Sequence, residues 1–193
     1  MTIRKARKEE ATVIAALLYD VLGSIARSHA AEETEAATCK VFERYVRSEE
    51  NRYSYRNIIV KEIQGTIAGM MVSYDGCNQR LLDIPIIELV RAKTRDLNYT
   101  TDLEAISGDL YIDSICVHPS FRGRGIGSEL LQQAEQMAKM QHLRLSLNVE
   151  VGNDRAETLY RRIGFHQEGY RMINNKPFKY MVKKIEELME EVR

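Results

Sequence analysis

Apolar and polar positions along the chain recur with two periods, which together predict a series of strands and helices. Residues 110–117 are apolar on both faces toward their end, as is typical of an interior strand. Residues 143–151 alternate apolar and polar side chains, as a strand does. From residue 126 to about residue 141, apolar side chains recur at helical spacing and predict an amphipathic helix. The other predicted strands are 2–6, 57–63, 66–74, 165–172 and 178–183, and the other predicted helices are 8–22, 32–46, 153–163 and one within 81–108.

Turn-forming residues mark where several of these elements end. Pro119 has no N–H for a sheet ladder and therefore ends the strand 110–117. Gly23-Ser24 predicts a bend in the first helix, and Asn174-Asn175 predicts the turn of a final hairpin. The charged tail 185–193 is expected to be helical.

The junction between the strand 110–117 and the helix that begins at residue 126 is rich in Gly and Arg. The first amides of a helix have no internal partners and lie at the positive end of its dipole. Where glycine leaves such amides uncovered, they form a pocket for a diphosphate, and neighbouring Arg and Ser side chains add charge and a further donor. This junction contains Gly123, Gly125 and Gly127, together with Arg122, Arg124, Ile126 and Ser128.

Two better-known glycine motifs do not fit this junction. The dinucleotide fingerprint G-x-G-x-x-G fails because Ser128 stands where its last glycine belongs, and the P-loop fails because no Gly-Lys-Ser/Thr follows. What matches is Arg122-x-x-Gly125-x-Gly127 behind Val117-x-Pro119, which resembles the coenzyme A loop of the GCN5-related N-acetyltransferase (GNAT) superfamily. A glycine-rich turn that binds no ligand is the alternative.

A second motif downstream is similar to the same superfamily. The segment Asn153-x-x-Ala156-x-x-x-Tyr160-x-x-x-Gly164-Phe165 matches its pattern, so the two motifs together cover residues 110–166. The resemblance implies an α/β (α+β) fold with a central mixed, mostly antiparallel sheet of six to seven strands flanked by helices. It implies a sheet that splays between 110–117 and 143–151, and a single domain over 1–193 whose coenzyme-binding core is about 110–166.

Composition narrows the class of protein further. The chain has 193 residues, a formal charge of +0 and a pI near 6.9, without the basic excess of a general nucleic-acid binder. No apolar run is long enough to span a bilayer, and the first residues lack the apolar core of a signal peptide. Cys39, Cys77 and Cys116 are isolated and show no metal-like spacing. We therefore expect a cytoplasmic protein without a metal, a nucleic-acid partner or a membrane partner, as a monomer or a homodimer.

The resemblance implies acetyl-CoA as a co-substrate that lies between the two splayed strands. Its pantetheine amides would pair with strand backbone near Ile115 and Val117, and its diphosphate would bind at 122–128. Asn153 would face the pantetheine arm, or would serve as a helix cap alone. The expected cofactor-binding residues are Ile115, Cys116, Val117, Arg122, Gly123, Arg124, Gly125, Ile126, Gly127, Ser128, Asn153 and Tyr160.

The reaction implied is direct attack of an amine on the thioester. An alkylammonium has a pKa of about 10.4 in water, so the amine must lose a proton first. The Val117 N–H is the family-like donor to the carbonyl oxygen. Tyr160 occupies the family's acid position, where it would protonate the thiolate; the alternative is that Tyr160 only packs in its helix.

The general base has more than one candidate in the sequence. Some relatives carry a glutamate at the position that Tyr111 occupies here. By strand alternation Tyr111, Asp113, Ile115 and Val117 share one face, which makes Asp113 the nearest acid. Asp113 is therefore our candidate base, although it could instead be a buried structural acceptor, and Glu104 or Asp109 could act through water. Cys116 is expected to face the core, and His118 is expected to be a loop residue rather than a catalyst.

Residues 81–108 form an insertion that could cover the acceptor site. From Asp96 to Asp113 this part of the chain carries several acids and no Lys or Arg. Acids of like charge beside an active site would attract a cationic amine, whereas a solvated acidic loop is the alternative. We expect N-acetylation of a small or peptidyl amine; a non-catalytic acyl-CoA-binding or regulatory domain is the competing function. The acids of this region are Asp96, Asp102, Glu104, Asp109 and Asp113.

Overall fold

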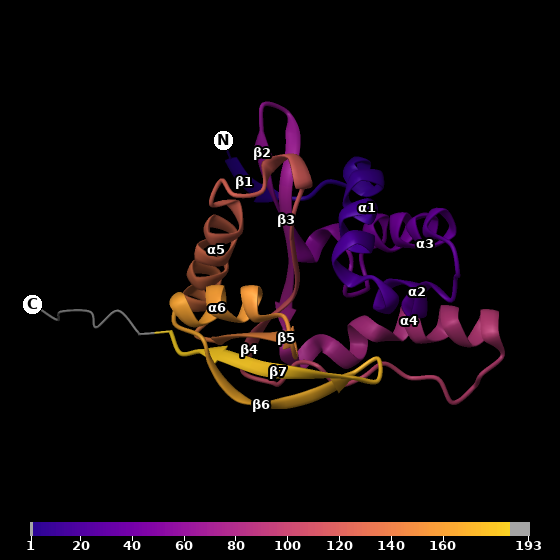
Figure 1. Ribbon diagram of the computed structural model, residues 1–193. Helices are drawn as coiled ribbons and strands as arrows, with labels where there is room; N and C mark the ends of the chain where they lie inside the picture. Colours follow the sequence, from indigo (N-terminus) through magenta and orange to yellow (C-terminus); the bar gives the residue numbers. More distant parts are fainter. Residues whose placement is uncertain (1, 186–193) are drawn as a thin grey trace, which may run out of the picture.

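The computed structural model describes residues 2–185, which form one seven-stranded sheet with helices on both faces (Figure 1). The strand order is β1-β2-β3-β4-β5-β7-β6, and every neighbouring pair is antiparallel except β4 and β5, which are parallel. The predicted mixed, mostly antiparallel sheet is therefore confirmed. The strands are β1 (Thr2–Lys5), β2 (Ile58–Ile63), β3 (Thr66–Asp75), β4 (Asp109–Val117), β5 (Arg144–Glu150), β6 (His166–Ile173) and β7 (Lys176–Lys183).

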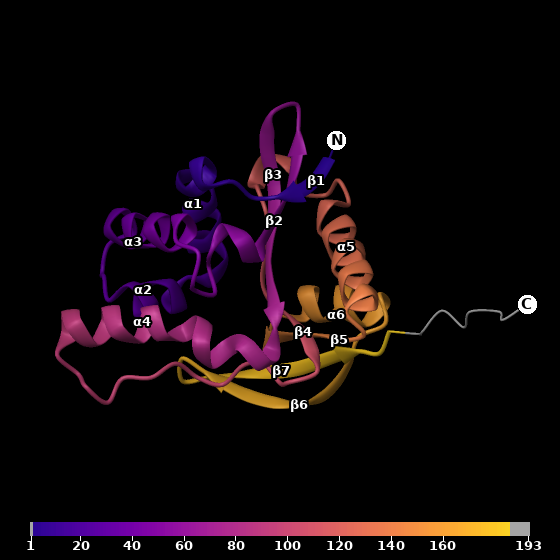
Figure 2. The same cartoon turned by 180° about the vertical axis from the view of Figure 1, so that it is seen from behind.

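Two groups of helices cover the two faces of the sheet, and each group has its own apolar core. In Figures 1 and 2, α1 to α4 lie on one side of the strands and α5 and α6 on the other. Apolar side chains of each group pack against the face of the sheet that they cover. The helices are α1 (Ala11–Leu22), α2 (Ser24–Ala30), α3 (Glu35–Arg47), α4 (Gln79–Thr94), α5 (Ile126–Met140) and α6 (Asp154–Arg162).

Several turn predictions are confirmed. Gly23, with φ of +54°, separates α1 from α2 at the predicted bend, and a short 3-10 turn precedes α1. Asn174 and Asn175 both have positive φ, as a two-residue hairpin turn requires, and they join β6 to β7. Residues 184 and 185 follow β7 without regular structure, and the remainder of the tail expected to be helical lies outside the described residues.

The central strand β4 contains a bulge that changes which side chains share a face. Val72 of β3 pairs with Ser114, and the next residue, Ser73, pairs with Ile112, so Asp113 is the extra residue. An extra residue shifts the alternation of side chains by one position. Tyr111 and Cys116 accordingly pack on the α1–α4 side, whereas Ile115 and Val117 pack on the α5–α6 side. The prediction that Tyr111, Asp113, Ile115 and Val117 share one face is therefore wrong, and Cys116 is buried in the core as expected.

The predicted splay of the sheet lies between β4 and β5. Their pairing runs from Asp109 and Arg144 to Ile112 and Leu147, where it ends. Beyond that point β5 stays paired with β7 as far as Glu150, while β4 stays paired with β3 as far as Val117. Each strand therefore leaves one backbone edge facing the space between them.

Candidate active site

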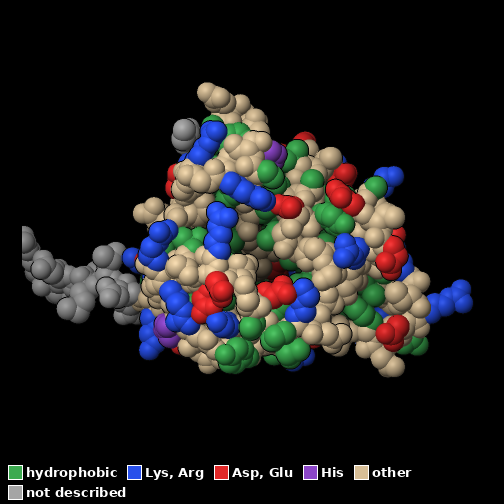
Figure 3. Space-filling model, viewed as in Figure 1, with side chains coloured by type: hydrophobic (Ala, Val, Ile, Leu, Met, Phe, Trp, Pro, Cys, Tyr) green, Lys and Arg blue, Asp and Glu red, His purple; other side chains and the backbone are tan. Residues whose placement is uncertain are grey.

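Two adjoining cavities occupy the space where β4 and β5 diverge. The cavity against the start of α5 has a volume of about 740 Å³, and the cavity deeper along β5 has a volume of about 390 Å³. Ile115, Asn153 and Tyr160 line both, so the two form one continuous groove. The face seen in Figure 3 is hollowed near its middle, and Lys and Arg side chains gather on the side of α5 and α6. We call the larger cavity the coenzyme cavity and the smaller one the acceptor cavity, after the ligands that the sequence resemblance implies for them.

The start of α5 forms one wall of the coenzyme cavity. Gly125 precedes the helix with φ of +79° and no side chain caps the helix there. The ladder of the helix begins with the Glu129 N–H, which donates to the Gly125 carbonyl at 3.1 Å, so the amides of residues 126–128 are left for an external acceptor. A Cβ added at Gly123 or Gly125 would meet no atom within 4 Å, which leaves open space beside the backbone. The wall can therefore receive an anion of the size of a diphosphate.

Most of the predicted cofactor-binding residues meet at this cavity. Arg124 is the exception among them, because its guanidinium lies over the Phe121 ring, 5.3 Å from the ring centroid, and does not line the cavity. Arg155 and Arg162, which the motif did not single out, line it and add positive charge. The predicted residues that line it are Ile115, Cys116, Val117, Arg122, Gly123, Gly125, Ile126, Gly127, Ser128, Asn153 and Tyr160.

The free edge of β4 directs backbone groups into the groove. His118 donates its N–H to the Ala68 carbonyl at 3.0 Å, which lies on the β3 side. Because successive residues of a strand direct their N–H groups to opposite edges, the Val117 N–H is directed toward the diverging β5 side. The Val117 carbonyl accepts a bond of 3.1 Å from Arg122 Nε. This stretch of backbone can therefore pair with an extended amide-bearing ligand.

The α6 residues of the second motif have distinct environments. The Asn153 side chain accepts from the Ala156 N–H at 3.2 Å, so Asn153 caps α6 and also lines the groove. Tyr160 is 9% exposed, lines both cavities and packs edge-on against Phe165. Burial raises the pKa of the Tyr160 hydroxyl to about 12, so this hydroxyl keeps its proton at neutral pH.

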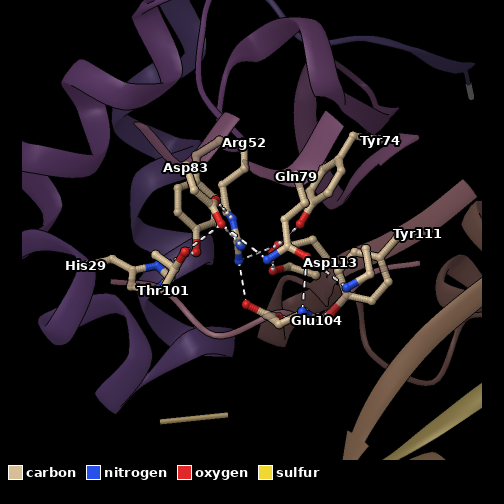
Figure 4. A network of polar contacts seen from close by, with 12 residues as sticks. His29, Arg52, Tyr74, Gln79, Asp83, Thr101, Glu104, Tyr111 and Asp113 are labelled. Carbon is tan, nitrogen blue, oxygen red and sulfur yellow. Dashed lines mark hydrogen bonds and ion pairs between the residues drawn. The ribbon is translucent and has the colours of Figure 1, made fainter. Parts of the chain in front are cut away.

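A buried charge cluster forms the floor of the acceptor cavity (Figure 4). The Arg52 guanidinium donates to both oxygens of Asp83, at 2.6 and 2.8 Å, and to Glu104 Oε1 at 2.6 Å. It also reaches Asp113 Oδ2 at 3.2 Å. The Arg52 side chain is 1% exposed, so one buried cation holds three carboxylates. The sequence motifs did not indicate Arg52 or Asp83. Asp83 lies on the same buried stripe of α4 as Ile86 and Val90, and an acid at such an apolar position could have indicated a buried partner.

The two carboxylates at the cavity wall are held differently. Asp113 accepts from Tyr74 at 3.2 Å and from Ser114 at 2.7 Å in addition to Arg52, which is the pattern of a structural acceptor. Glu104 Oε2 accepts from the Tyr111 hydroxyl at 3.0 Å. Burial raises the pKa of both carboxyls, and the charge of Arg52 opposes that rise.

Of the five acids from Asp96 to Asp113, Glu104 and Asp113 line the acceptor cavity, whereas Asp96, Asp102 and Asp109 do not. Asp109 pairs with Arg144 at 2.7 Å and accepts from the Tyr180 hydroxyl, and it does not line the acceptor cavity. The Asp102 side chain accepts from the Asn174 N–H at 2.7 Å. Each carboxylate is directed by its own partner, which a linear run of like charges does not reveal.

Residues 2–185 show neither a cluster of metal ligands nor a membrane-spanning helix. This part of the chain contains no group of three or more His, Cys, Asp or Glu side chains placed to hold a metal ion. None of its helices is both long enough and apolar enough to cross a bilayer.

Comparison with known proteins identifies the family. The model of the acetyltransferase (GNAT) family matches residues 24–165. A Bacillus subtilis (strain 168) protein, provisionally named a [ribosomal protein bS18]-alanine N-acetyltransferase, is 30% identical over 114 residues, which are 58% of this chain and 76% of that protein.

Solved structures agree with this assignment. A crystal structure described as an acetyltransferase is 29% identical, with a TM-score of 0.80 over 96% of this chain and 100% of the other. An N-acetyltransferase from Staphylococcus aureus Mu50 has the same fold, with a TM-score of 0.80 at 24% identity over 94% of this chain and 100% of its own. The divergence of β4 from β5 and the uncapped start of α5 are consistent with the family model that matches residues 24–165. The chain therefore belongs to the acetyltransferase (GNAT) family.

Proposed function

We propose that the protein transfers an acetyl group from acetyl-CoA to a primary amine of a small molecule or a peptide. The observation that carries this proposal is the position of the uncapped α5 N-terminus at the mouth of the gap between β4 and β5. A ligand whose anionic end is bound at residues 126–128 would extend directly into the groove, and ionisable side chains line the inner end of that groove. Such a groove suits a long ligand with a charged end and a reactive end.

The residues of the coenzyme cavity fit acyl-CoA. The amides of residues 126–128 and the Arg122 guanidinium would hold the diphosphate, and the free edge of β4 at Ile115 and Val117 would pair with pantetheine amides. When bound, acyl-CoA supplies an electrophilic thioester carbonyl. The Val117 N–H is directed toward the groove and would stabilise the negative charge that develops on the carbonyl oxygen.

Tyr160 is suited to the role of the acid. Its hydroxyl remains protonated at neutral pH and lines both cavities. A thiol has a pKa of about 8.5, so a tyrosine hydroxyl donated to the departing sulfur would ease its release. This role requires only that the hydroxyl reaches the sulfur.

Glu104 is the better candidate for the base, with Asp113 as its structural neighbour. Asp113 accepts bonds from three side chains and stabilises Arg52. Glu104 lines the acceptor cavity, has a raised pKa and is oriented by the Tyr111 hydroxyl, which stands where some relatives carry a glutamate. A carboxylate with a raised pKa is a stronger base once ionised, and it would accept the proton of the attacking ammonium, directly or through one water. The insertion 81–108 would thus supply the carboxylate and one wall of the acceptor site.

The charges of the acceptor cavity favour a cationic acceptor without a nearby carboxylate. Arg52 is occupied by its three acids, and Lys176 pairs with Glu150 at 2.8 Å. The charged side chains that line the cavity are four acids, Asp20, Glu104, Asp113 and Glu150, and two bases, Arg52 and Lys176, so a free α-amino acid would bring its carboxylate against a wall of net negative charge. A peptide α-amine, as in the name of the Bacillus subtilis relative, and a small amine both satisfy this condition.

The competing function is an acyl-CoA-binding domain without catalysis, which the presence of Tyr111 would favour. Glu104 and Tyr160 at the same groove favour the enzyme, because the groove keeps a carboxylate and a protonated hydroxyl. A thiol-release assay with acetyl-CoA would be run on polyamines, aminoglycosides, amino acids and Ala-initiated peptides, and repeated with longer acyl chains. Calorimetric CoA binding without turnover on any amine would support the binding domain.

A matched pair of variants tests the assignment of the base. Glu104→Gln should lower kcat at least about 100-fold and abolish the rise of kcat/KM with pH that the raised carboxyl pKa produces. Asp113→Asn keeps Glu104 in place, so it should lower the free energy of unfolding while its kcat falls much less than that of Glu104→Gln. If Asp113→Asn removes the pH-dependent rise and Glu104→Gln does not, Asp113 is the base.

A further inference from the structure

The coenzyme cavity contains one feature that is unexpected for a site that binds an anion. Among the described residues that line it, the charged side chains are Arg122, Arg155, Arg162 and one acid, Asp20 of α1. A carboxylate beside a diphosphate is repelled by it, so Asp20 would weaken the binding of acyl-CoA where it now stands. Asp20 also lines the acceptor cavity.

The contacts of Asp20 explain its position. Asp20 Oδ2 accepts a bond of 2.9 Å from Arg122 Nη2, and the same guanidinium donates through Nε to the Val117 carbonyl at 3.1 Å. Asp20 is therefore the ion-pair partner of Arg122, the guanidinium that the coenzyme loop would offer to a diphosphate. Arg122 in turn covers a carbonyl on the strand edge where an extended ligand would pair.

We propose that Asp20 is an exchangeable anion. The diphosphate of acyl-CoA displaces Asp20 from Arg122, and the released carboxylate then receives the positively charged acceptor amine in the acceptor cavity. This inference rests on the function proposed above, because it assumes that both ligands share the groove. It makes Asp20 a positioning residue for the amine and couples the binding of the two substrates.

The strength of the ion pair permits this exchange. The side chains of Asp20 and Arg122 are 51% and 53% exposed, and pairs with such exposure change an equilibrium constant by about five-fold at most. A diphosphate carries more charge and gains bonds from Arg122 and from the uncapped amides of α5 at the same time. Among residues 2–185, the only other hydrogen bond to the Asp20 carboxylate comes from the weak donor Cys116 Sγ at 3.8 Å, so few bonds hold the carboxylate once Arg122 has turned away.

The exchange has a consequence for the order of binding. While Asp20 is paired with Arg122, its charge is neutralised and it attracts an ammonium group weakly. After displacement it carries an uncompensated charge at the boundary of the acceptor cavity. By linkage, acyl-CoA raises the affinity for the amine, and the amine raises the affinity for acyl-CoA by the same factor.

Asp20→Asn tests both halves of the proposal, since the half-exposed position tolerates a near-isosteric change. We expect CoA to bind up to about five-fold more tightly by calorimetry, because the competing carboxylate is gone. We expect KM for the best amine of the panel to rise at least five-fold, with kcat changed less than two-fold. In an Arg122→Met background, Asp20→Asn should raise CoA affinity less than it does in the wild-type background, because the pair no longer exists and only the repulsion between Asp20 and the diphosphate is removed.

The control Asp154→Asn makes the same charge change at the first turn of α6, between the lining residues Asn153 and Arg155. It should change CoA affinity less than Asp20→Asn does and leave the amine KM unchanged. An unchanged or lowered CoA affinity in Asp20→Asn, an unchanged amine KM, or an equal effect in the Arg122→Met background each overturns the exchange. If wild-type protein acetylates no amine, the proposed function fails, while the CoA measurements still report on the Asp20–Arg122 competition.

Discussion

Replacing Arg52 with methionine removes the guanidinium from a pocket that holds three carboxylates. Methionine has a similar length and no charge, so the change leaves the apolar part of the side chain in place. Arg52 donates four hydrogen bonds in this pocket, two of them to Asp83. The substitution therefore leaves Asp83, Glu104 and Asp113 facing one another without their cation.

The expected cost follows from the burial of the cluster. Removing one partner of a buried ion pair costs about 3–5 kcal/mol, because the remaining charge is uncompensated. The Arg52 side chain is 1% exposed and those of Asp83 and Asp113 are 2% exposed, so solvent screens the loss very little. Since a domain has a free energy of unfolding of about 5–15 kcal/mol, Arg52→Met should lose a large part of it.

The loss should depend on pH. Without Arg52 the pKa values of Glu104 and Asp113 rise further above those of the unfolded chain, so the native state binds more protons than the unfolded state. The free energy of unfolding then falls as pH rises through that interval. The deficit of Arg52→Met relative to wild type should be larger at about pH 8 than at about pH 5.5.

Urea unfolding at both pH values, monitored by circular dichroism, measures the loss in free energy of unfolding of Arg52→Met relative to wild type. Arg52→Lys keeps the charge but loses the two-pronged contact with Asp83, and it should fall between wild type and Arg52→Met. Arg47→Met is the surface control, because Arg47 is half exposed and pairs with Glu43 on its own helix; it should change stability by less than about 0.5 kcal/mol. A deficit below about 1 kcal/mol for Arg52→Met, or one that shrinks as pH rises, would refute this account.

Three further predictions concern the groove and the core. Gly125→Glu should weaken CoA binding at least about 100-fold by calorimetry, because it places a carboxylate at the anion site. Gly125→Ala puts an uncharged side chain on the same backbone with φ of +79°, so both variants share the backbone strain and Gly125→Ala should bind CoA more tightly than Gly125→Glu. Tyr160→Phe should lower kcat about 100-fold or more while CoA affinity stays unchanged, whereas an equal kcat would mean that Tyr160 only packs. Burial holds the pKa of His29 at about 3, so the unfolded chain takes up a proton that the native state refuses as pH falls below about 6.5. Relative to His29→Gln, wild type should therefore lose about 2 kcal/mol of stability between about pH 8 and about pH 5 in urea titrations, and parallel curves would contradict this.

Much of the fold could be predicted from local patterns, because those patterns depend on backbone chemistry. Helical and alternating periods identified all seven strands and the helices of residues 2–185 except α2, and the paired asparagines at 174–175 identified the hairpin turn. The glycines at 123 and 125 marked the start of α5, because positive φ and an open backbone are properties that glycine provides locally. The loop proposed to bind the coenzyme could therefore be located from local sequence alone.

The floor of the acceptor site could not be predicted in the same way. Alternation placed Asp113 on one face with Val117, and the bulge in β4 broke that alternation because pairing with β3 accommodates one extra residue. The cluster joins Arg52, Asp83, Glu104 and Asp113, which are up to 61 positions apart in the chain. No local spacing connects them.

The sequence by itself determined the order of the elements, the glycine-rich start of α5 and the Asn153–Phe165 motif, because each depends on residues within one or two turns of one another. The tertiary structure alone decided which carboxylates meet the groove, that Asp109 and Asp102 are directed elsewhere, and that Asp20 pairs with Arg122. The physical reason is that the pKa and direction of a carboxylate depend on burial and on the cation or hydroxyl that reaches it. Both are set by packing between segments that are distant in the chain.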